Sequence, residues 1–240
     1  MGQIKTDYIK KLPVTFPKVF VETGTFLGGI PLMSLVDKSF DDWDKMYTIE
    51  LSEECCKIAS TRYKLYEELG KSHDFKEQWS KDEDKDFNDR EKYFDGKLHL
   101  LQGDSSDRLK DVLDEVDERC AFWLDAHAGA KDLYTRGEVD CPLLEELNII
   151  KDHKIKEHLI AIDDAHLFGE TEYKNGEIVC DYSKITRERV EGIIKSINPK
   201  YTIEYHQPYG QLMLVAYVEP MIDGGGTWWK NSKTEIGETK

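Results

Sequence analysis

The sequence is poor in the features that mark zinc-bound, disulfide-bonded or membrane-spanning proteins. Its five cysteines are an odd number, and no two of them have the Cys-x-x-Cys spacing of zinc and redox sites. This argues against a zinc framework and against a disulfide scaffold. Cys120 begins an apolar run, which favours a buried, reduced thiol. We therefore expect a reducing, cytoplasmic location.

Long apolar stretches and an excess of positive charge are also missing. No run reaches the length of a transmembrane helix, and the N-terminus lacks the apolar core of a signal peptide. Residues 1–6 fit the myristoylation pattern, but no strong basic patch follows as a second membrane anchor. With 33 basic and 48 acidic residues, the net charge of −15 repels phosphate backbones. We expect neither a membrane span nor general nucleic-acid binding.

The chain is organised around residues 19–29, where an apolar run ends in Glu22 and a glycine-containing turn follows. A strand, turn and helix in this order direct backbone N–H groups at a nucleotide-like ligand. Glycine is needed where a Cβ atom would block the approach of the backbone. The pattern is Glu-x-Gly-x-Phe-x-Gly rather than Gly-x-Gly-x-x-Gly, so taken alone it also fits an ordinary strand–turn–helix corner.

Apolar segments alternate with helical ones over most of the chain. We expect strands at 19–21, 46–49, 98–101, 121–124 and 159–162, and a closing antiparallel hairpin at 202–205 and 212–218. The alternation predicts an α/β fold with a doubly wound parallel sheet. A length of 240 residues fits one domain. That domain would carry an N-terminal extension at 1–17, a charged insertion at 71–96 and a flexible tail at 219–240.

Acidic residues end all of the first five predicted strands. They are Glu22, Glu50, Asp104, Asp125 and the pair Asp163 and Asp164. Ligands of open α/β sheets bind outside the carboxyl ends of the strands. One such acid is commonly a turn residue or a helix cap, but five strands that end this way predict a ligand-binding crevice.

Two of these acids suit a nucleoside. Glu50 can accept hydrogen bonds from ribose hydroxyls, because Ser52 is placed to cap the helix that follows. Asp104 can accept from an adenine amino group while the Ser105 N–H donates to a ring nitrogen. A role for Asp104 as the cap of the next helix explains it almost as well.

The remaining acids indicate a cation. Asp125, Asp163 and Asp164 end neighbouring strands, and their carboxylates repel one another unless a cation or a proton intervenes. Oxygen ligands favour Mg²⁺, Mn²⁺ or Ca²⁺ over zinc. In the alternative, one aspartate caps a helix, another binds an amine of the ligand, and no metal is present.

Two histidines follow these acids at the same spacing. His127 lies two residues after Asp125, and a neutral imidazole there could remove a proton during the reaction. His166 has the same spacing from Asp164 and is the rival base. Both also fit a structural role. The sequence predicts surface positions for the histidines at 73, 153 and 158.

Six motifs in order along residues 18–218 carry a family resemblance. They are Val-Phe-Val-Glu-Thr-Gly-Thr-Phe-Leu-Gly-Gly, Tyr-Thr-Ile-Glu-Leu-Ser, Leu-Leu-Gln-Gly-Asp-Ser-Ser, Phe-Trp-Leu-Asp-Ala-His, Cys-Pro-Leu-Leu-Glu-Glu-Leu and Ile-Asp-Asp-Ala-His-Leu-Phe. Together they resemble class I S-adenosylmethionine-dependent methyltransferases, especially proteins associated with surface-glycan gene clusters. The resemblance implies a Rossmann-like, seven-stranded sheet of order 3-2-1-4-5-7-6 with strand 7 antiparallel.

The resemblance also implies site residues. Contacts to S-adenosylmethionine would come from Glu22, Thr23, Gly24, Thr25, Gly28, Glu50, Asp104, Ser105 and Asp125. The sequence is also similar to a subgroup of Mg²⁺-dependent sugar O-methyltransferases. That similarity implies Mg²⁺ or Mn²⁺ at Asp125, Asp163 and Asp164, with His127 as the base and Asp125 in the catalytic centre.

The sequence thus predicts O-methyl transfer to a sugar hydroxyl of a glycan or a glycosylated small molecule. Loops at 71–96, 128–141 and 167–182 would select the acceptor, and a homo-oligomer is compatible with the sequence. One alternative is a cofactor-binding interaction module without catalysis. Another is an NAD-dependent oxidoreductase, because Glu50 would also suit the ribose of NAD.

Overall fold

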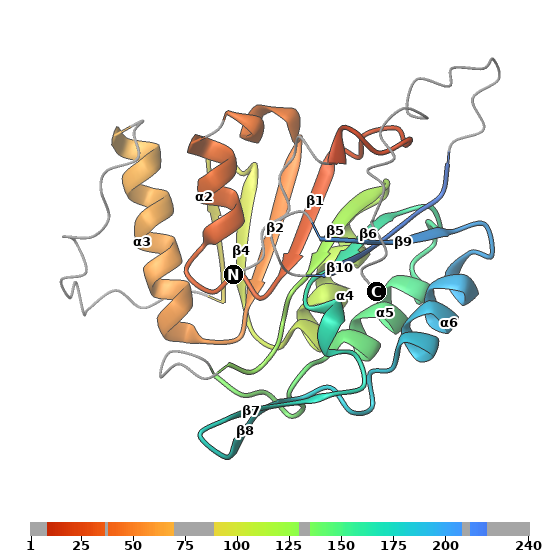
Figure 1. Cartoon of the computed structure of the whole chain (residues 1–240). Coiled ribbons are helices and arrows are strands. Elements are labelled where there is room, and N and C mark those ends of the chain that lie inside the picture. Colours follow the sequence, from red (N-terminus) through yellow and green to blue (C-terminus); the bar gives the residue numbers. More distant parts are fainter. Residues whose placement is uncertain (1–8, 37, 70–88, 130–134, 208–211, 220–240) are drawn as a thin grey trace.

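The central element is an eight-stranded, mostly parallel sheet (Figure 1). The computed structural model describes residues 9–36, 38–69, 89–129, 135–207 and 212–219. Five parallel strands form the middle of the sheet, in the order β4-β2-β1-β5-β6. Their bounds are β1 (Val19–Thr23), β2 (Lys45–Glu50), β4 (Leu98–Gln102), β5 (Cys120–Leu124) and β6 (Leu159–Ile162).

A hairpin completes one edge of the sheet. Strand β10 (Met213–Tyr217) lies antiparallel between β6 and β9 (Thr202–His206). The order β4-β2-β1-β5-β6-β10-β9 confirms the predicted order 3-2-1-4-5-7-6 with an antiparallel seventh strand. Because β1, β2, β4, β5 and β6 are parallel, their carboxyl ends lie at one edge, and the strand order reverses between β1 and β5, where a ligand crevice is expected.

Helices cover both faces of the sheet, as Figure 1 shows. On one face lie α2 (Gly29–Val36) and α3 (Glu53–Leu69), and on the other lie α4 (Ser105–Glu115), α5 (Leu143–Asp152) and α6 (Arg187–Ile197). Alternate residues of β1 face the two apolar layers: Val19 and Val21 join the α4–α6 side, and Phe20 joins the other. Ile9 and Leu12 of the predicted N-terminal extension are buried with Phe20. No helix in the described ranges is long and apolar enough to cross a membrane.

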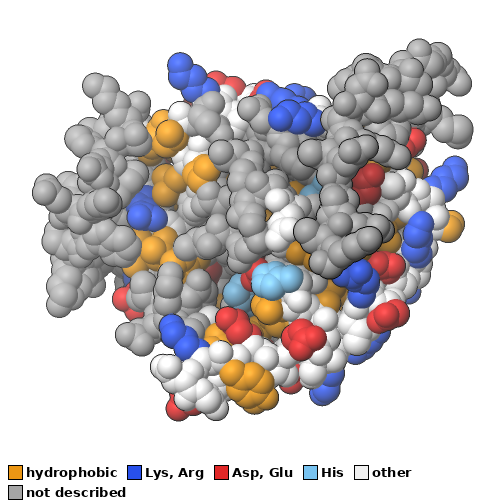
Figure 2. All heavy atoms as spheres, in the orientation of Figure 1, with side chains coloured by type: hydrophobic (Ala, Val, Ile, Leu, Met, Phe, Trp, Pro, Cys, Tyr) orange, Lys and Arg blue, Asp and Glu red, His pale blue; other side chains and the backbone are white. Residues whose placement is uncertain are grey.

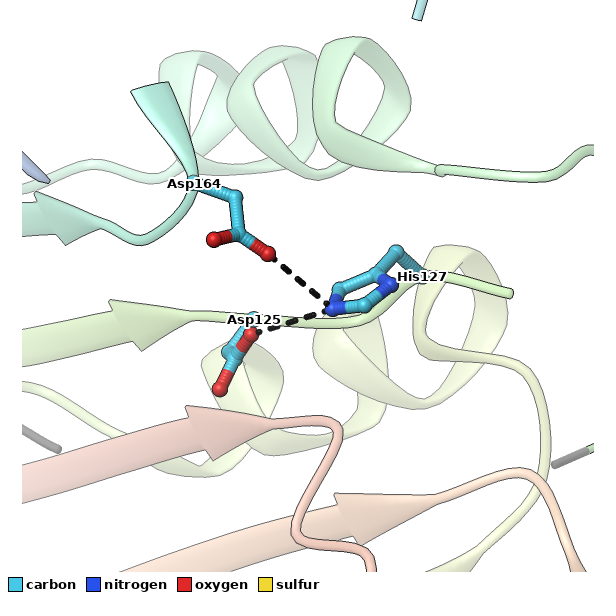
Figure 3. A group of neighbouring side chains, drawn as sticks. All are labelled: Asp125, His127 and Asp164. Atoms are coloured by element: carbon cyan, nitrogen blue, oxygen red, sulfur yellow. Dashed lines mark ion pairs between the residues drawn. The ribbon is translucent and has the colours of Figure 1, made fainter. Parts of the chain in front are cut away.

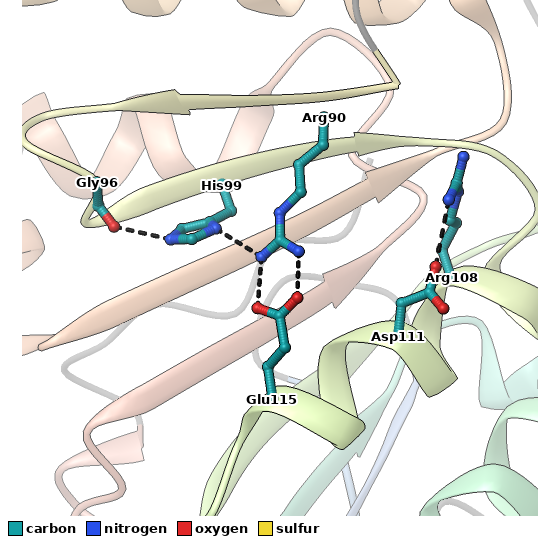
Figure 4. A network of polar contacts seen from close by, with 6 residues as sticks. All are labelled: Arg90, Gly96, His99, Arg108, Asp111 and Glu115. Atoms are coloured by element: carbon teal, nitrogen blue, oxygen red, sulfur yellow. Dashed lines mark hydrogen bonds and ion pairs between the residues drawn. The ribbon is translucent and has the colours of Figure 1, made fainter.

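The predicted insertion at 71–96 ends in a strand that was not predicted from the sequence. Residues 70–88 lie outside the described part of the chain, but β3 (Arg90–Tyr93) pairs antiparallel with β4. Arg90 donates to both carboxylate oxygens of Glu115 on α4 and to Nδ1 of His99 at 2.8 Å (Figure 4). The His99 ring in turn donates from Nε2 to the Gly96 carbonyl at 2.8 Å. These bonds fasten a polar strand to the sheet edge where apolar burial is small.

The predicted loop after β6 contains a hairpin of its own. A short helical turn, η2 (Ala165–Leu167), is followed by β7 (Thr171–Lys174) and β8 (Glu177–Asp181), which form a separate two-stranded sheet. Asn175 and Gly176 join them with φ angles of 54° and 85°. An Asn-Gly pair with two positive φ angles is the strongest short hairpin signal in a sequence, so the expectation of a loop at 167–182 was wrong.

His153 and His158 are buried, which corrects their predicted surface positions. His158 is 0 % exposed and His153 is 8 % exposed. The Cys120 N–H donates to Nδ1 of His158 at 3.0 Å, so Nε2 of His158 carries the proton and donates to Nδ1 of His153 at 2.9 Å. His153 then donates from Nε2 to the Val116 carbonyl at 3.0 Å. This chain of donors requires both rings to be neutral.

The neutral histidine pair makes stability depend on pH. Burial lowers the pKa of His158 to about 3, so in mild acid the unfolded chain binds a proton that the folded chain does not. The stabilisation is complete above the unfolded pKa of about 6.5 and is lost as pH falls toward 3. We expect the difference in unfolding free energy between wild type and His158→Gln to shrink by at most about 1.4 kcal/mol per pH unit. Denaturant titrations at pH 7, 6 and 5 measure this, and a pH-independent difference would contradict it.

Candidate functional site

The turn after β1 is held tightly against β2. The N–H groups of Gly24 and Thr25 both donate to the Ile49 carbonyl, at 2.9 and 3.1 Å. Gly24 has a φ of +77°, and a Cβ built on it would lie 2.4 Å from the carbonyl oxygen of Asp125. The turn after β1 and the end of β5 therefore approach each other so closely that only glycine fits between them.

Glu50, the last residue of β2, fastens the middle of the same turn. Its Oε2 accepts from the Phe26 N–H at 2.7 Å, and its Oε1 accepts from the Ser52 N–H at 2.8 Å. Phe26 has a φ of 53°, an uncommon conformation for an aromatic residue, which the bond to Glu50 helps to hold. Burial raises the pKa of Glu50, while the backbone donors oppose the shift. Ser52 caps α3 as predicted, since its Oγ accepts from the Cys55 N–H.

A cleft opens over these strand ends. Five of the predicted cofactor-binding residues line it: Gly24, Glu50, Asp104, Ser105 and Asp125. Asp104 also caps α4, because its Oδ1 accepts from the N–H and the hydroxyl of Ser106 at 2.9 and 2.7 Å. The two roles weighed for Asp104 are therefore compatible, since its second oxygen remains at the cleft.

The other four predicted cofactor residues do not line this cleft. Thr23, Thr25 and Gly28 belong to the strand end and turn beneath it, and Glu22 is 3 % exposed. Glu22 accepts from the Thr48 hydroxyl at 2.5 Å. Burial raises the pKa of Glu22 to about 7, although the bond from Thr48 opposes the shift. Their direct contact with a cofactor stays a prediction.

The segment at 135–140 lines the cleft and was not predicted to do so individually. A Cβ on Gly137 would lie 2.8 Å from Oδ2 of Asp104, so this segment passes close over the end of β4. Arg136 donates to the Val179 carbonyl of β8 at 3.0 Å, and the Asp181 N–H donates to Oδ2 of Asp140 at 3.0 Å. The β7–β8 hairpin is thereby joined to the wall of the cleft. The sequence of residues 135–140 is simply polar, and polarity alone does not predict which residues the segment contacts.

Asp125 and His127 line the cleft, and Asp164 converges on them (Figure 3). Nε2 of His127 lies 3.5 Å from Oδ1 of Asp125 and 3.4 Å from Oδ2 of Asp164. Burial alone would lower the pKa of His127, but the Asp125 carboxylate and the Ala128 carbonyl raise it to about 12. The acids around His127 therefore favour the protonated ring when no other cation is present.

Asp163 and His166 stand at the margin of this group. Asp163 is 6 % exposed, and burial together with the charges of Asp125 and Asp164 raises its pKa to about 7. It is not among the three residues whose ligand atoms lie within 4.8 Å of one another. Nδ1 of His166 is 3.8 Å from Oδ1 of Asp164, and its side chain is 45 % exposed. In Figure 2, which has the orientation of Figure 1, histidine and acidic side chains lie together near the centre of the visible face, above the β7–β8 hairpin.

Glu146 on α5 is a buried acid that the sequence did not single out. It is 1 % exposed and lines a small cavity together with Asp125, His127 and Asp163. Its Oε1 has no hydrogen-bond partner among the described residues. Burial raises the pKa of Glu146 to about 7. Its neighbour Glu145 is exposed, and because both acids lie in the first turn of a helix, sequence alone does not separate them.

The chain is similar in structure to known proteins, but its sequence is not close to theirs. No family model matches the chain, and no curated protein matches it. Similar solved structures include the SAH-bound methyltransferase PaMTH1 of Podospora anserina (12% identity, TM-score 0.45, covering 84% of this chain and 72% of that one). Others are an O-methyltransferase from Bacillus cereus in complex with SAH (15%, 0.47, 84% and 74%) and TomG from Streptomyces achromogenes in complex with SAM (13%, 0.47, 89% and 77%).

Proposed function

We propose that this protein is an S-adenosylmethionine-dependent O-methyltransferase. The observation that supports this most strongly is the single cleft to which three strand ends contribute distinct chemistry. Gly24 after β1 offers close backbone approach, Glu50 ends β2 with a fixed carboxylate, and Asp104 follows β4. A nucleoside cofactor with a charged amino-acid tail needs these three kinds of contact in this order along a sheet edge.

Each cleft residue has a defined part in this proposal. Each carboxylate oxygen of Glu50 accepts one backbone bond and keeps a second lone pair for a ribose hydroxyl. Asp104 and Ser105 would hold the adenine, and the backbone around Gly24 would hold the methionine end. Because the donor is a reactive sulfonium, the protein mainly has to align donor and acceptor and to manage one proton.

The acceptor would enter beside Asp125 and Asp164, at the end of the cleft. The carboxylate oxygens that converge there, together with Nε2 of a neutral His127 ring, form a donor set that fits a divalent cation. When bound, such an ion acts as a Lewis acid that lowers the pKa of an acceptor hydroxyl. A sugar offers adjacent hydroxyls for this purpose, so we retain a sugar or glycan acceptor, with Mg²⁺ or Mn²⁺ held by Asp125, Asp164 and the adjoining Asp163.

Calorimetric titration tests the cofactor assignment. We expect S-adenosylhomocysteine to bind with one site per chain and NAD to leave that binding unchanged, since the cleft ends in an acidic group rather than a second nucleotide subsite. Absence of binding would reject the proposal, and displacement by NAD would favour an oxidoreductase. Binding without methyl transfer to any monosaccharide or glycan acceptor, with and without Mn²⁺, would favour a non-catalytic binding module.

A further inference from the structure

The orientation of the His127 ring is fixed by its backbone contact. Nδ1 lies 2.7 Å from the carbonyl oxygen of Ala128, and a carbonyl can only accept. Nδ1 therefore carries a proton, and Nε2 is the atom directed at Asp125 and Asp164 (Figure 3). In a neutral ring this Nε2 has a free lone pair. A backbone acceptor on one ring nitrogen is the usual arrangement when the other nitrogen binds a metal.

The spacing of these three side chains suits a shared ion. The separations between Nε2 and the two carboxylates are 3.4 and 3.5 Å, at the long limit of hydrogen bonding. Two ligands that each stand about 2.1 Å from one ion lie about 3.0–3.4 Å apart, depending on the geometry. Nε2 of His127 lies at nearly equal distances from both acids, close to the upper end of this range.

A second, independent feature of this region is a buried acid whose hydrogen bonding is incomplete. Glu146 comes from a different element, α5, and lines the small cavity beside Asp125 and His127. Its carboxyl group is 1 % exposed, and Oε1 has no hydrogen-bond partner in the described part of the chain. The Ser105 and Thr23 hydroxyls are the donors that face it, and both of them also lack a regular hydrogen-bond partner in the described part of the chain. A buried acceptor left in this way is costly unless a cation or a donor completes the site.

We infer that His127 is a metal ligand, together with Asp125 and Asp164, rather than the base of the reaction. The inference rests on the proposed function for the identity of the site, but it changes the chemistry of that site. One imidazole nitrogen and two carboxylates favour Mn²⁺ or another first-row transition ion over Mg²⁺, which prefers oxygen ligands. A coordinated nitrogen has no lone pair left to take the proton of the acceptor hydroxyl, so His127 cannot act as the base that the sequence predicted.

Electron spin-echo spectroscopy of the full-length protein with Mn²⁺ tests the ligand set directly. We expect a nitrogen coupling in the wild type that changes to the ¹⁵N pattern when histidine is ¹⁵N-labelled, and that disappears in His127→Asn. His166→Gln is the matched control, because His166 is also near Asp164 but has a largely exposed ring 3.8 Å away. This control should keep the coupling. In calorimetry, Mn²⁺ should bind at least about tenfold more weakly to His127→Asn than to the wild type.

The result that would overturn the inference is Mn²⁺ binding without nitrogen coupling, or coupling that persists in His127→Asn and vanishes in His166→Gln. Absence of Mn²⁺ binding, or tighter binding of Mg²⁺ than of Mn²⁺, would also overturn it. Thermal melting shows whether His127→Asn is folded, and His127→Gln serves as a second variant if it is not. Titration with S-adenosylhomocysteine in metal-free buffer separates the two proposals, because its failure removes the methyltransferase assignment while the spectroscopy reports on the metal site alone.

Discussion

Gly24→Ala is expected to abolish the binding of S-adenosylhomocysteine and to lower the stability of the fold. A Cβ at this position would lie 2.4 Å from the carbonyl oxygen of Asp125 and 2.9 Å from the Cα of Ala126. Both are backbone atoms, so no side chain can rotate away. The turn would have to separate from β5 and would strain its bonds to Ile49. We expect a loss of about 2–5 kcal/mol in unfolding free energy, measured by denaturant titration alongside calorimetric binding.

Gly96→Ala is the matched control for this substitution. Gly96, in the turn between β3 and β4, has a φ of +82°, close to the +77° of Gly24, but apart from its own and adjacent residues no described atom lies within 4 Å of its Cβ position. The control thus carries the strain of a left-handed alanine without the collision. We expect it to lose about 1–2 kcal/mol of stability and to bind S-adenosylhomocysteine as the wild type does. Equal effects of the two substitutions would show that the close approach of the turn and β5 is unimportant.

Glu50→Gln is expected to weaken S-adenosylhomocysteine binding by about 10- to 150-fold, which corresponds to about 1.5–3 kcal/mol. Both carboxylate oxygens accept backbone N–H groups, from Phe26 and Ser52. An amide has only one oxygen, so one backbone donor would face an NH₂ group, and a ribose hydroxyl would lose its charged acceptor. Calorimetry at pH 7.5 measures the change. Because burial raises the pKa of Glu50, the affinity of the wild type should move toward that of the variant as the pH is lowered.

The control for Glu50 is the same exchange at Glu115. That side chain also makes a two-point contact, to Arg90, but at the edge of the sheet and with 45 % of its surface exposed (Figure 4). Glu115→Gln should leave the binding constant unchanged. If Glu50→Gln also left the binding constant for S-adenosylhomocysteine unchanged, the Glu50 carboxylate would have no part in holding the cofactor.

The sequence predicted the parallel core well, because its signals are local. Strand β1 ends within two residues of its predicted limit, and β6 has its predicted bounds. Apolar runs with acids at their ends mark buried parallel strands, and the alternation with helices fixes their common direction. That direction is enough to bring Glu50, Asp104 and Asp125 to one edge, where all three line the cleft.

Features that depend on long-range contacts were not predictable in this way. Strand β3 is polar, and its place in the sheet depends on partners in α4 and β4. His153 and His158 resemble surface residues until the fold joins them to Cys120 and Val116. The β7–β8 hairpin is different, because Asn175 and Gly176 form an Asn-Gly pair, which is a hairpin signal visible in the sequence itself.

The contact between Gly24 and the end of β5 has a consequence for how such a protein can diversify. The atoms that press on Gly24 are the carbonyl carbon and oxygen of Asp125 and the Cα of Ala126, and none of them belongs to a side chain. The shape of the turn after β1 therefore does not depend on which side chain stands at position 125. Evolution or an engineer can exchange the acid there, and with it the kind of acceptor, while the turn keeps its shape.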